Sequence, residues 1–133
     1  MSTVHVAVGV ILDPQCNILI SRRAENSHQG GLWEFPGGKV ESGESLAAAL
    51  DRELHEELGI RVGRTTPLLQ VNHDYGDKAV LLDVHVVWEF SGSACGLEDQ
   101  PLAWVPAPEL SRYAFPAANE PIVAAVQELL NTG

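Results

Sequence analysis

Residues 45–60, SLAAALDRELHEELGI, form the most strongly helical stretch of the sequence. Alanine, leucine and glutamate have high helix propensity, and Gly59 stands where a left-handed C-terminal cap is expected. At about 100° per residue, three leucines fall on one side of this helix and form an apolar stripe: Leu50, Leu54 and Leu58. The stretch therefore predicts a helix, beginning at Ser45, that packs one side against a hydrophobic core.

Three glutamates lie beside that stripe. Glu53, Glu56 and Glu57 fall within an arc of about 100° on the predicted helix. Glu53 and Glu57 form an i,i+4 pair of like charge, which costs a helix roughly 0.2 to 0.5 kcal/mol. Arg52 precedes Glu56 by four residues, which is the less favourable order for an ion pair on a helix. Either this face is simply solvated, or its carboxylates are gathered to bind a cation.

The composition limits the possible partners. The chain has 133 residues, 45% of them hydrophobic, which suits one globular domain spanning residues 1–133. Its net charge of −10 disfavours nucleic-acid polymers and anionic membranes. Cys16 and Cys95 form no CxxC motif and fit a reducing compartment. Because we find no export leader and no membrane-spanning apolar run, we expect a cytoplasmic protein. We also expect it to be a monomer.

The rest of the chain alternates between strand and turn signals before a final helix. Residues 4–12 and 17–23 are rich in β-branched residues and flank the turn DPQC, so they predict a hairpin. We expect paired strands at 68–75 and 79–90, a short strand at 102–106, and a loop or broken strand within WEFPGGK at 33–39. Residues 119–131 predict a helix. Strands between two helices indicate a mixed sheet covered on both faces.

Glycines and cations adjoin the predicted acidic helix. Gly37 and Gly38 allow the backbone to approach a ligand closely, while Lys39, Arg22 and Arg23 supply positive charge in an acidic protein. Carboxylate oxygens select hard cations, and Mg²⁺ characteristically binds a few carboxylates together with substrate phosphates. The pattern predicts a site for a metal ion and a diphosphate.

The spacing of these residues resembles the Nudix box. Gly38 is followed after five residues by Glu44, and after seven more by the run from Arg52 to Ile60, so every fixed position of the box is filled. The segments AVGVI, ISRRA, LWEFPGGK and FPAANEP are similar to the MutT branch of this family, which hydrolyses oxidised guanine nucleoside triphosphates. The resemblance covers nearly the whole chain. It implies an α/β fold, an α/β/α sandwich with a central mixed sheet and a loop-helix-loop metal site.

The resemblance also implies a ligand set and a reaction. The metal ligands would be the Gly37 carbonyl oxygen and the carboxylates of Glu53, Glu56, Glu57 and Glu98, holding Mg²⁺, for which Mn²⁺ could substitute. The substrate would be an oxidised purine nucleoside triphosphate such as 8-oxo-dGTP. Water would attack its β-phosphorus to give the monophosphate and pyrophosphate, which would clear a damaged nucleotide before replication.

Further residues have implied catalytic roles. Glu53 is our candidate for the base that deprotonates the attacking water, with Glu98 as the alternative. Arg52 would hold a catalytic glutamate in place, and Lys39 would stabilise charge on the phosphates in the transition state. Glu44 would support these groups, or would only complement the dipole at the start of the helix.

Base selection is the finer prediction. Guanine has acceptors at O6 and N7, whereas 8-oxoguanine has a proton on N7, so one asparagine amide can donate to O6 and accept from N7 of the oxidised base only. Asn119 in FPAANEP is the candidate, and its alternative role is to cap the final helix. The resemblance also implies contacts by Arg23 and by the main chain at Phe35. Lys78 stands where relatives often have arginine, which weakens a planar, bidentate contact.

Two other functions share part of this pattern. A Nudix hydrolase acting on ordinary or methylated deoxynucleotides, ADP-ribose or dinucleoside polyphosphates would keep the metal ligands and change the pocket, where Tyr75 could stack on a base. A non-catalytic module that binds oxidised guanine would lack box carboxylates, and none is missing here. The sequence therefore favours a Nudix hydrolase of oxidised guanine nucleotides.

Overall fold

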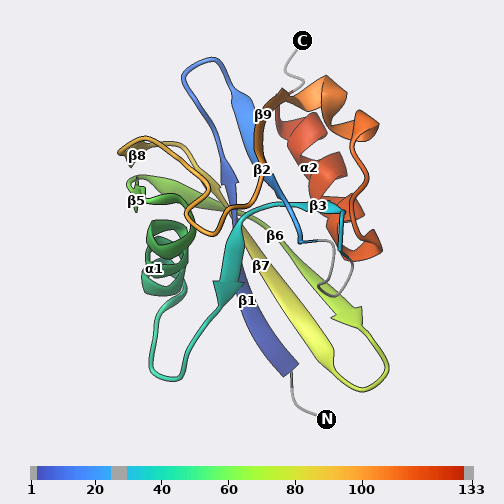
Figure 1. Ribbon diagram of the computed structural model, residues 1–133. Coiled ribbons are helices and arrows are strands. Elements are labelled where there is room, and N and C mark those ends of the chain that lie inside the picture. Colours follow the sequence, from blue (N-terminus) through green and yellow to red (C-terminus); the bar gives the residue numbers. More distant parts are fainter. Residues whose placement is uncertain (1–2, 25–29, 131–133) are drawn as a thin grey trace.

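The computed structural model describes residues 3–24 and 30–130 (Figure 1). Its helical elements are α1 (Leu46–Leu58), α2 (Glu120–Leu130) and the 3₁₀ turns η1 (Ala107–Arg112) and η2 (Ala117–Asn119). Its strands are β1 (Thr3–Ile11), β2 (Asn17–Arg22), β3 (Trp33–Glu34), β4 (Gly37–Lys39), β5 (Arg61–Val62), β6 (Thr65–Asp74), β7 (Ala79–Val87), β8 (Phe90–Ser91) and β9 (Leu102–Pro106). None of the helices in these ranges is long and apolar enough to cross a membrane.

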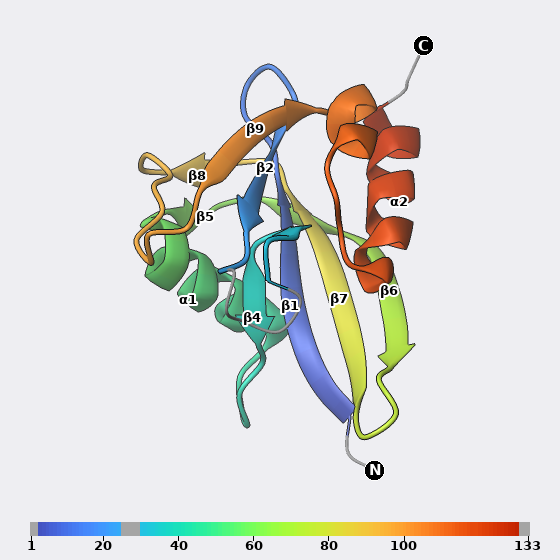
Figure 2. The same cartoon turned by 45° about the vertical axis from the view of Figure 1, so that its right-hand side comes forward.

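The largest sheet is mixed, as predicted. Its strand order is β4-β1-β7-β6, in which β1 and β7 run parallel and the two outer pairs are antiparallel. A second sheet has the order β3-β2-β9, and β5 pairs with β8. Figure 2 shows β9 beside β2, with the β4 strand leading from this smaller sheet toward α1.

The hairpin predicted for the first two strands is wrong beyond its turn. The Asp13 carboxylate accepts hydrogen bonds from the backbone N–H groups of Gln15 and Asn17 at 2.9 and 2.8 Å, so the turn itself forms. Beyond one isolated bridge between Leu12 and Ile18, however, β1 and β2 enter different sheets. Both edges of β1 are already paired, to β4 and β7, which leaves β2 to pair with β3 and β9.

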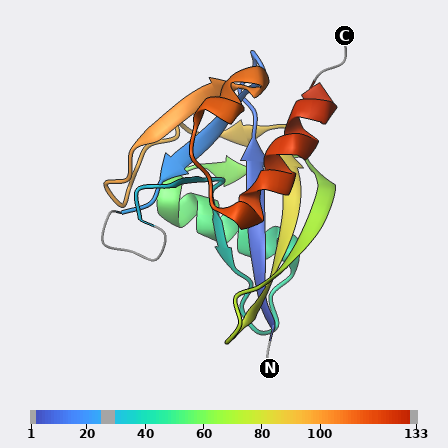
Figure 3. The same ribbon diagram turned by 90° about the vertical axis from the view of Figure 1, so that its right-hand side faces the viewer.

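The two helices cover opposite faces of the large sheet, which confirms the predicted sandwich. Successive strand residues point to opposite faces. Ala7 and Ile11 of β1 therefore pack with Leu50, Leu54 and Leu58 of α1. The alternate residues of β1 and β7, including Val10 and Val84, pack with Ile122 and Val126 of α2. Figure 3 shows α2 lying across the sheet, with α1 behind it.

Helix α1 forms as the sequence predicts. The Ser45 hydroxyl accepts a hydrogen bond from the Ala48 N–H at 3.1 Å, which caps the first turn. Gly59 has a φ of 75° and its N–H donates to the His55 carbonyl oxygen, which ends the helix in the left-handed conformation. The caps fix the position of the glutamate-bearing turns relative to β4.

Candidate active site

The Gly37–Gly38 pair brings β4 against the acidic face of α1. A side chain at Gly38 would overlap the carboxyl group of Glu53, and one at Gly37 would overlap the backbone of Ala7 and Val8. Only glycine therefore fits at position 37, whereas a side chain at position 38 would displace the Glu53 carboxylate. The close approach places main-chain groups of β4 directly beside the glutamates of α1.

Arg52 ties the elements of the site together. Its guanidinium binds both carboxylate oxygens of Glu44 at 2.7 and 3.0 Å, one oxygen of Glu53 at 2.9 Å, and the Lys39 carbonyl oxygen at 3.0 Å. The hydrogen bond from Arg52 is the largest cause that lowers the pKa of Glu44 to about 2. The Arg52 guanidinium also lies 3.6 Å from a carboxylate oxygen of Glu56. This distance is longer than its hydrogen bonds to Glu44 and Glu53. The arginine therefore fixes Glu53 rather than simply relieving repulsion along the helix.

Glu57 lies in the most electrostatically unfavourable place in the site. Its pKa is raised from 4.5 to about 8, mainly by burial and then by the neighbouring carboxylates of Glu53, Glu98 and Glu34. A hydrogen bond from the Gly37 N–H acts in the opposite direction. Neighbouring carboxylates whose mutual repulsion is only partly relieved are the kind of oxygen donors that a hard divalent cation needs, so these residues fit such an ion.

The ligand set does not converge on one point as the side chains stand. Among residues 3–24 and 30–130, no three acidic, histidine or cysteine side chains are grouped closely enough to hold a metal ion. Glu56 is 56% exposed, and Glu98 is also exposed, so these two predicted ligands face solvent. The structure thus places Glu53 and Glu57 at the centre of the predicted site and Glu56 and Glu98 at its margin.

Gln100 fastens the loop that carries Glu98 to the end of α1. Its side-chain N–H donates to the Glu57 carbonyl oxygen at 3.1 Å, while its side-chain oxygen accepts from the Glu98 N–H at 2.9 Å. The Leu97 N–H donates to the same Glu57 carbonyl oxygen at 3.0 Å. These bonds bring Glu98 near Glu57 although the two residues are far apart in the sequence.

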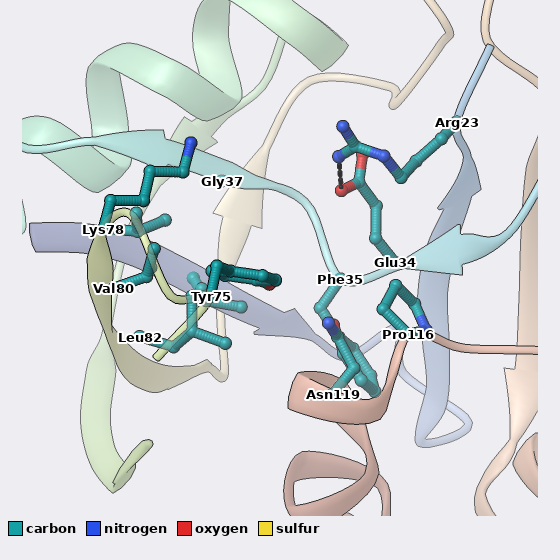
Figure 4. Close-up of a pocket in the computed structure, with 12 residues that line it drawn as sticks. Arg23, Glu34, Phe35, Gly37, Tyr75, Lys78, Val80, Leu82, Pro116 and Asn119 are labelled. Atoms are coloured by element: carbon teal, nitrogen blue, oxygen red, sulfur yellow. Dashed lines mark hydrogen bonds and ion pairs between the residues drawn. The ribbon is translucent and has the colours of Figure 1, made fainter. Parts of the chain in front are cut away.

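A cavity of ≈ 210 Å³ opens on the other side of β4 (Figure 4). Its apolar walls include Val80 and Leu82 from β7, and Phe35 is 4% exposed and stacked on Phe115. Polar groups enter from separate elements: Arg23 and Glu34, Lys78 and Tyr75 of the β6–β7 hairpin, and Asn119. A cavity that combines apolar walls with convergent polar groups is typical of a small-molecule site.

Asn119 lies in this cavity rather than capping α2. It belongs to the 3₁₀ turn that leads into the helix, so the chain is already helical at this residue. Within the described ranges its side chain takes no hydrogen bond, whether to the backbone of α2 or elsewhere. The amide is half-buried at the cavity wall with its donor and acceptor available.

A second cavity of ≈ 210 Å³ connects this region with the carboxylates. Arg23 and Glu34 line both cavities and are paired to each other at 2.7 Å. Glu57 and Glu98 line the second cavity only. A ligand with one end in the apolar cavity and a phosphate chain among the carboxylates would therefore pass the Arg23–Glu34 pair.

Comparison with known proteins decides the family. A model of the NUDIX domain matches residues 7–125, which includes α1, β4 and nearly all of the two cavities. The chain belongs to the Nudix hydrolase family.

Similar Nudix proteins include two from Escherichia coli (strain K12). The 8-oxo-dGTP diphosphatase is 36% identical over 129 residues, covering 97% of this chain and 100% of the relative. The CTP pyrophosphohydrolase is 35% identical over 122 residues, covering 92% and 90%. A solved structure from a study of MutT from Aliivibrio salmonicida and Vibrio cholerae has a TM-score of 0.88 at 37% identity, covering 97% of this chain and 100% of that one.

As a Nudix hydrolase, the chain requires a divalent metal ion. The structure brings most of the predicted site residues together around β4 and α1, with Arg52, Glu44, Glu53 and Glu57 in contact or close proximity. Lys39 is exposed and is the cross-strand partner of Val6, so its side chain lies on the face of the sheet that holds the first cavity. Lys78 is exposed at the rim of that cavity.

Two polar residues of this Nudix site escaped sequence reasoning. Gln100 was missed because its two partners, the Glu57 carbonyl and the Glu98 N–H, are backbone groups. A hydrogen bond to the backbone requires no particular partner residue, so no sequence motif indicates it. Ser21 stands in an ordinary strand sequence, yet it is 5% exposed and lines the second cavity. A hydroxyl among the buried aliphatic residues of NILISR is the one sequence signal that could have singled out Ser21.

Proposed function

We propose that this chain hydrolyses 8-oxo-dGTP to 8-oxo-dGMP and pyrophosphate, with Mg²⁺ as the metal and Mn²⁺ as a substitute. The observation that supports this most strongly is the unpaired amide of Asn119 in a cavity that adjoins the glutamates of α1. The 8-oxo-dGTP diphosphatases among the relatives support the same substrate. The activity would remove a mutagenic precursor from the nucleotide pool.

The base would lie in the first cavity between Asn119 and the β6–β7 hairpin. The Asn119 amide would donate to O6 and accept from the N7–H of 8-oxoguanine. Guanine has no proton on N7, so the second hydrogen bond could not form with the ordinary base. Phe35 is stacked on Phe115, so it offers its main chain rather than its ring. Arg23, which is paired with Glu34, would face the base and sugar at the opening toward the carboxylates.

The metal would be held by the Gly37 carbonyl oxygen together with Glu53, Glu56, Glu57 and Glu98. When bound, a divalent ion neutralises the phosphates and makes a coordinated water more acidic. The structure supports this ligand set through the raised pKa of Glu57, whose carboxyl is buried among other acids. Oxygen ligands of this kind favour Mg²⁺ or Mn²⁺ over softer metals.

Water would be activated by Glu53. Arg52 donates to one oxygen of Glu53, which leaves the other oxygen to accept a proton from the water that attacks the β-phosphorus. Glu44 holds Arg52 by two hydrogen bonds, so its role is to fix the arginine. Lys39 would stabilise the charge that develops on the phosphate oxygens. Glu98, which is exposed on the loop held by Gln100, is the alternative base.

One chain supplies both cavities, so we expect the protein to act as a monomer, and we expect it to meet its nucleotide substrate in the cytoplasm. A pyrimidine triphosphate is the second candidate, because one relative is a CTP pyrophosphohydrolase and Lys78 presents a single flexible ammonium rather than a planar guanidinium. The metal ligands would serve both substrates equally.

The test is to identify the products and the preferred base in one experiment. Pyrophosphate and orthophosphate release would be measured from 8-oxo-dGTP, dGTP and CTP, with Mg²⁺ and with EDTA. We expect pyrophosphate, Mg²⁺ dependence and the highest kcat/KM for 8-oxo-dGTP. Release of orthophosphate would contradict attack at the β-phosphorus, and a higher kcat/KM for CTP would favour the second candidate.

A further inference from the structure

Glu34 is a carboxylate between the two cavities to which the reaction described above gives no role. It is the second residue of β3, and its side chain lines both cavities. A carboxylate repels the phosphates of a nucleotide. Its place beside the path of a phosphate chain therefore requires an explanation.

The pairing of β2 with β3 places Glu34 beside Arg23. Ser21 lies opposite Glu34 in this register. The Arg23 N–H donates to the Leu32 carbonyl oxygen at 2.8 Å, which continues the pairing beyond the end of β2. Because Arg23 lies two residues after Ser21, its side chain is on the same face as that of Glu34. The two residues are thus diagonal neighbours, a separation that long side chains can span.

Glu34 holds the arginine by a short, charge-assisted hydrogen bond. Arg23 Nη1 donates to Glu34 Oε1 at 2.7 Å, and the two side chains are 31% and 33% exposed. An ion pair this exposed adds little to the stability of a protein. An arginine side chain is flexible, however, and a ligand that binds a loose guanidinium must also restrict its motion. Pairing with Glu34 restricts that motion before the ligand arrives.

The ion pair lies where a nucleotide would extend from one cavity into the other. Arg23 and Glu34 line both cavities, of which the first contains Asn119 and the second contains Glu57. Figure 4 shows the two side chains meeting beside the first cavity. A guanidinium has only donors, so at this opening it can bind oxygen atoms of the base and sugar.

The contact with Arg23 also weighs against a role for Glu34 as a further metal ligand. The charge of Glu34 contributes to the raised pKa of Glu57, so the two carboxylates are close enough to interact. One oxygen of Glu34, however, is already bound by a guanidinium, and that positive charge repels a cation at the same carboxylate. Positioning of the arginine is the role that the contacts favour.

We propose that Glu34 is a positioning residue that holds the Arg23 guanidinium at the opening between the two cavities, where the guanidinium binds the nucleoside end of the substrate. This inference rests on the proposed function in taking a nucleoside triphosphate as the substrate and Arg23 as one of its contacts. It does not depend on the identity of the base. Glu34 acts through Arg23 and touches neither the metal ion nor the phosphate chain.

The test is a double-mutant cycle of Glu34→Ala and Arg23→Ala, with steady-state kinetics on 8-oxo-dGTP, dGTP and CTP in the presence of Mg²⁺. We expect Arg23→Ala to raise KM about 10 to 100 fold, as for a lost hydrogen bond to a charged group. Glu34→Ala should raise KM about 3 to 10 fold, because binding must then order a long side chain. Its kcat should stay close to that of wild type. In the Arg23→Ala protein, Glu34→Ala should not raise KM further.

Three comparisons separate positioning from other roles. Glu34→Gln keeps an oxygen that can accept from Arg23, so its KM should lie between those of wild type and Glu34→Ala. The affinity of Glu34→Ala for inorganic pyrophosphate with Mg²⁺ should not fall, because pyrophosphate lacks the nucleoside. Glu109→Ala is the matched control and should leave KM unchanged, because Glu109 pairs with Arg112 at 3.5 Å on η1, outside both cavities.

An unchanged KM in either single variant would overturn the proposal, whatever happens to the Tm. An equal rise in KM on removing Glu34 from wild type and from Arg23→Ala would also overturn it. Weaker pyrophosphate binding would do the same, because Glu34 would then act on the metal ion or the phosphates. A wild type that prefers CTP would refute only the proposed substrate, and the coupling of Glu34 to Arg23 measured with CTP would decide this proposal by the same criteria.

Discussion

The two halves of this site are built in opposite ways. Around α1 and β4 the polar groups already bind one another, and Arg52 alone makes hydrogen bonds to Glu44, Glu53 and the Lys39 carbonyl. In the first cavity the Asn119 amide is unpaired within the described chain, and Lys78 is exposed at the rim. The network around Arg52 is formed before the substrate arrives, whereas the Asn119 amide in the first cavity keeps its donor and acceptor for the ligand.

That difference assigns different consequences to substitutions in each half. Changes around α1 should lower turnover for every substrate, because every nucleotide uses the same metal ion and water. Changes in the first cavity should alter the choice of base and leave the chemistry intact. The experiments below test this separation, beginning with the largest expected effect.

Glu53→Gln should produce the largest loss. Removing the proposed base should lower kcat by roughly 10² to 10⁴ fold for both 8-oxo-dGTP and dGTP. The fold should persist, because glutamine can still accept the hydrogen bond from Arg52. Steady-state kinetics and circular dichroism would measure these outcomes. A large loss for one nucleotide only would break the separation of the two halves.

Gln100→Leu should give an intermediate loss. Without the two hydrogen bonds of Gln100, the Glu98 loop is no longer fixed to the end of α1, and residues that orient metal ligands typically change affinity or activity by about 10 to 100 fold. Titration with Mn²⁺ should show the weaker metal affinity directly.

Gln127→Leu provides the comparison for Gln100. Its side chain also makes two hydrogen bonds, donating both to the Ala107 carbonyl and the Ser111 hydroxyl, and these bonds join α2 to η1. We expect normal Mn²⁺ affinity in this variant. Equal losses in the two variants would show that Gln100 acts only through overall stability.

The pKa of Glu57 predicts a pH dependence of stability in the metal-free protein. Because the folded-state pKa is raised to about 8, folding favours the protonated carboxyl. Its contribution to stability is therefore present below pH 4.5 and is lost as the pH rises toward 8. Glu57→Gln should remove this loss and raise the metal-free Tm at pH 8.5 on the order of 5 °C. A Tm difference that does not change between pH 4.5 and 8.5 would contradict the assignment.

Lys78→Arg should have the smallest effect and would sharpen the description of the base half. A guanidinium adds planar donors at the cavity rim, so we expect a gain of a few fold in the preference for 8-oxo-dGTP over dGTP. The kcat for 8-oxo-dGTP should stay close to that of wild type. A drop in kcat for all substrates would place Lys78 with the catalytic half.

The sequence predicted helix α1 better than the pairing of the strands, for physical reasons. Helix α1 depends on local propensity, caps and spacing, so its limits and its acidic face could be predicted from residues 45–60. The pairing of β1 with β4 and β7, rather than with β2, depends on competition between distant segments. Local β-propensity contains no information about that competition, and the predicted hairpin was therefore wrong.

Asn119 and Ser21 show the same limit within the site. At Asn119 the sequence was compatible with both a helix cap and a base contact, and the 3₁₀ turn before α2 separates the two. At Ser21 the relevant fact is that a mostly buried polar residue lines the second cavity, which requires knowledge of the neighbouring strands and helix. Residues whose role depends on what surrounds them in space could be found only from the structure.

The most direct test of the account is the ratio of kcat/KM for 8-oxo-dGTP to that for dGTP, measured with Mg²⁺ for wild type and Asn119→Ala side by side. We expect a ratio of about 10³ or more for wild type, because guanine would leave the buried amide mispaired. The ratio should fall by at least about 10² fold in Asn119→Ala, with dGTP hydrolysis retained. The same ratio in both proteins would contradict base selection by Asn119, and a wild-type ratio near one would contradict the proposed substrate.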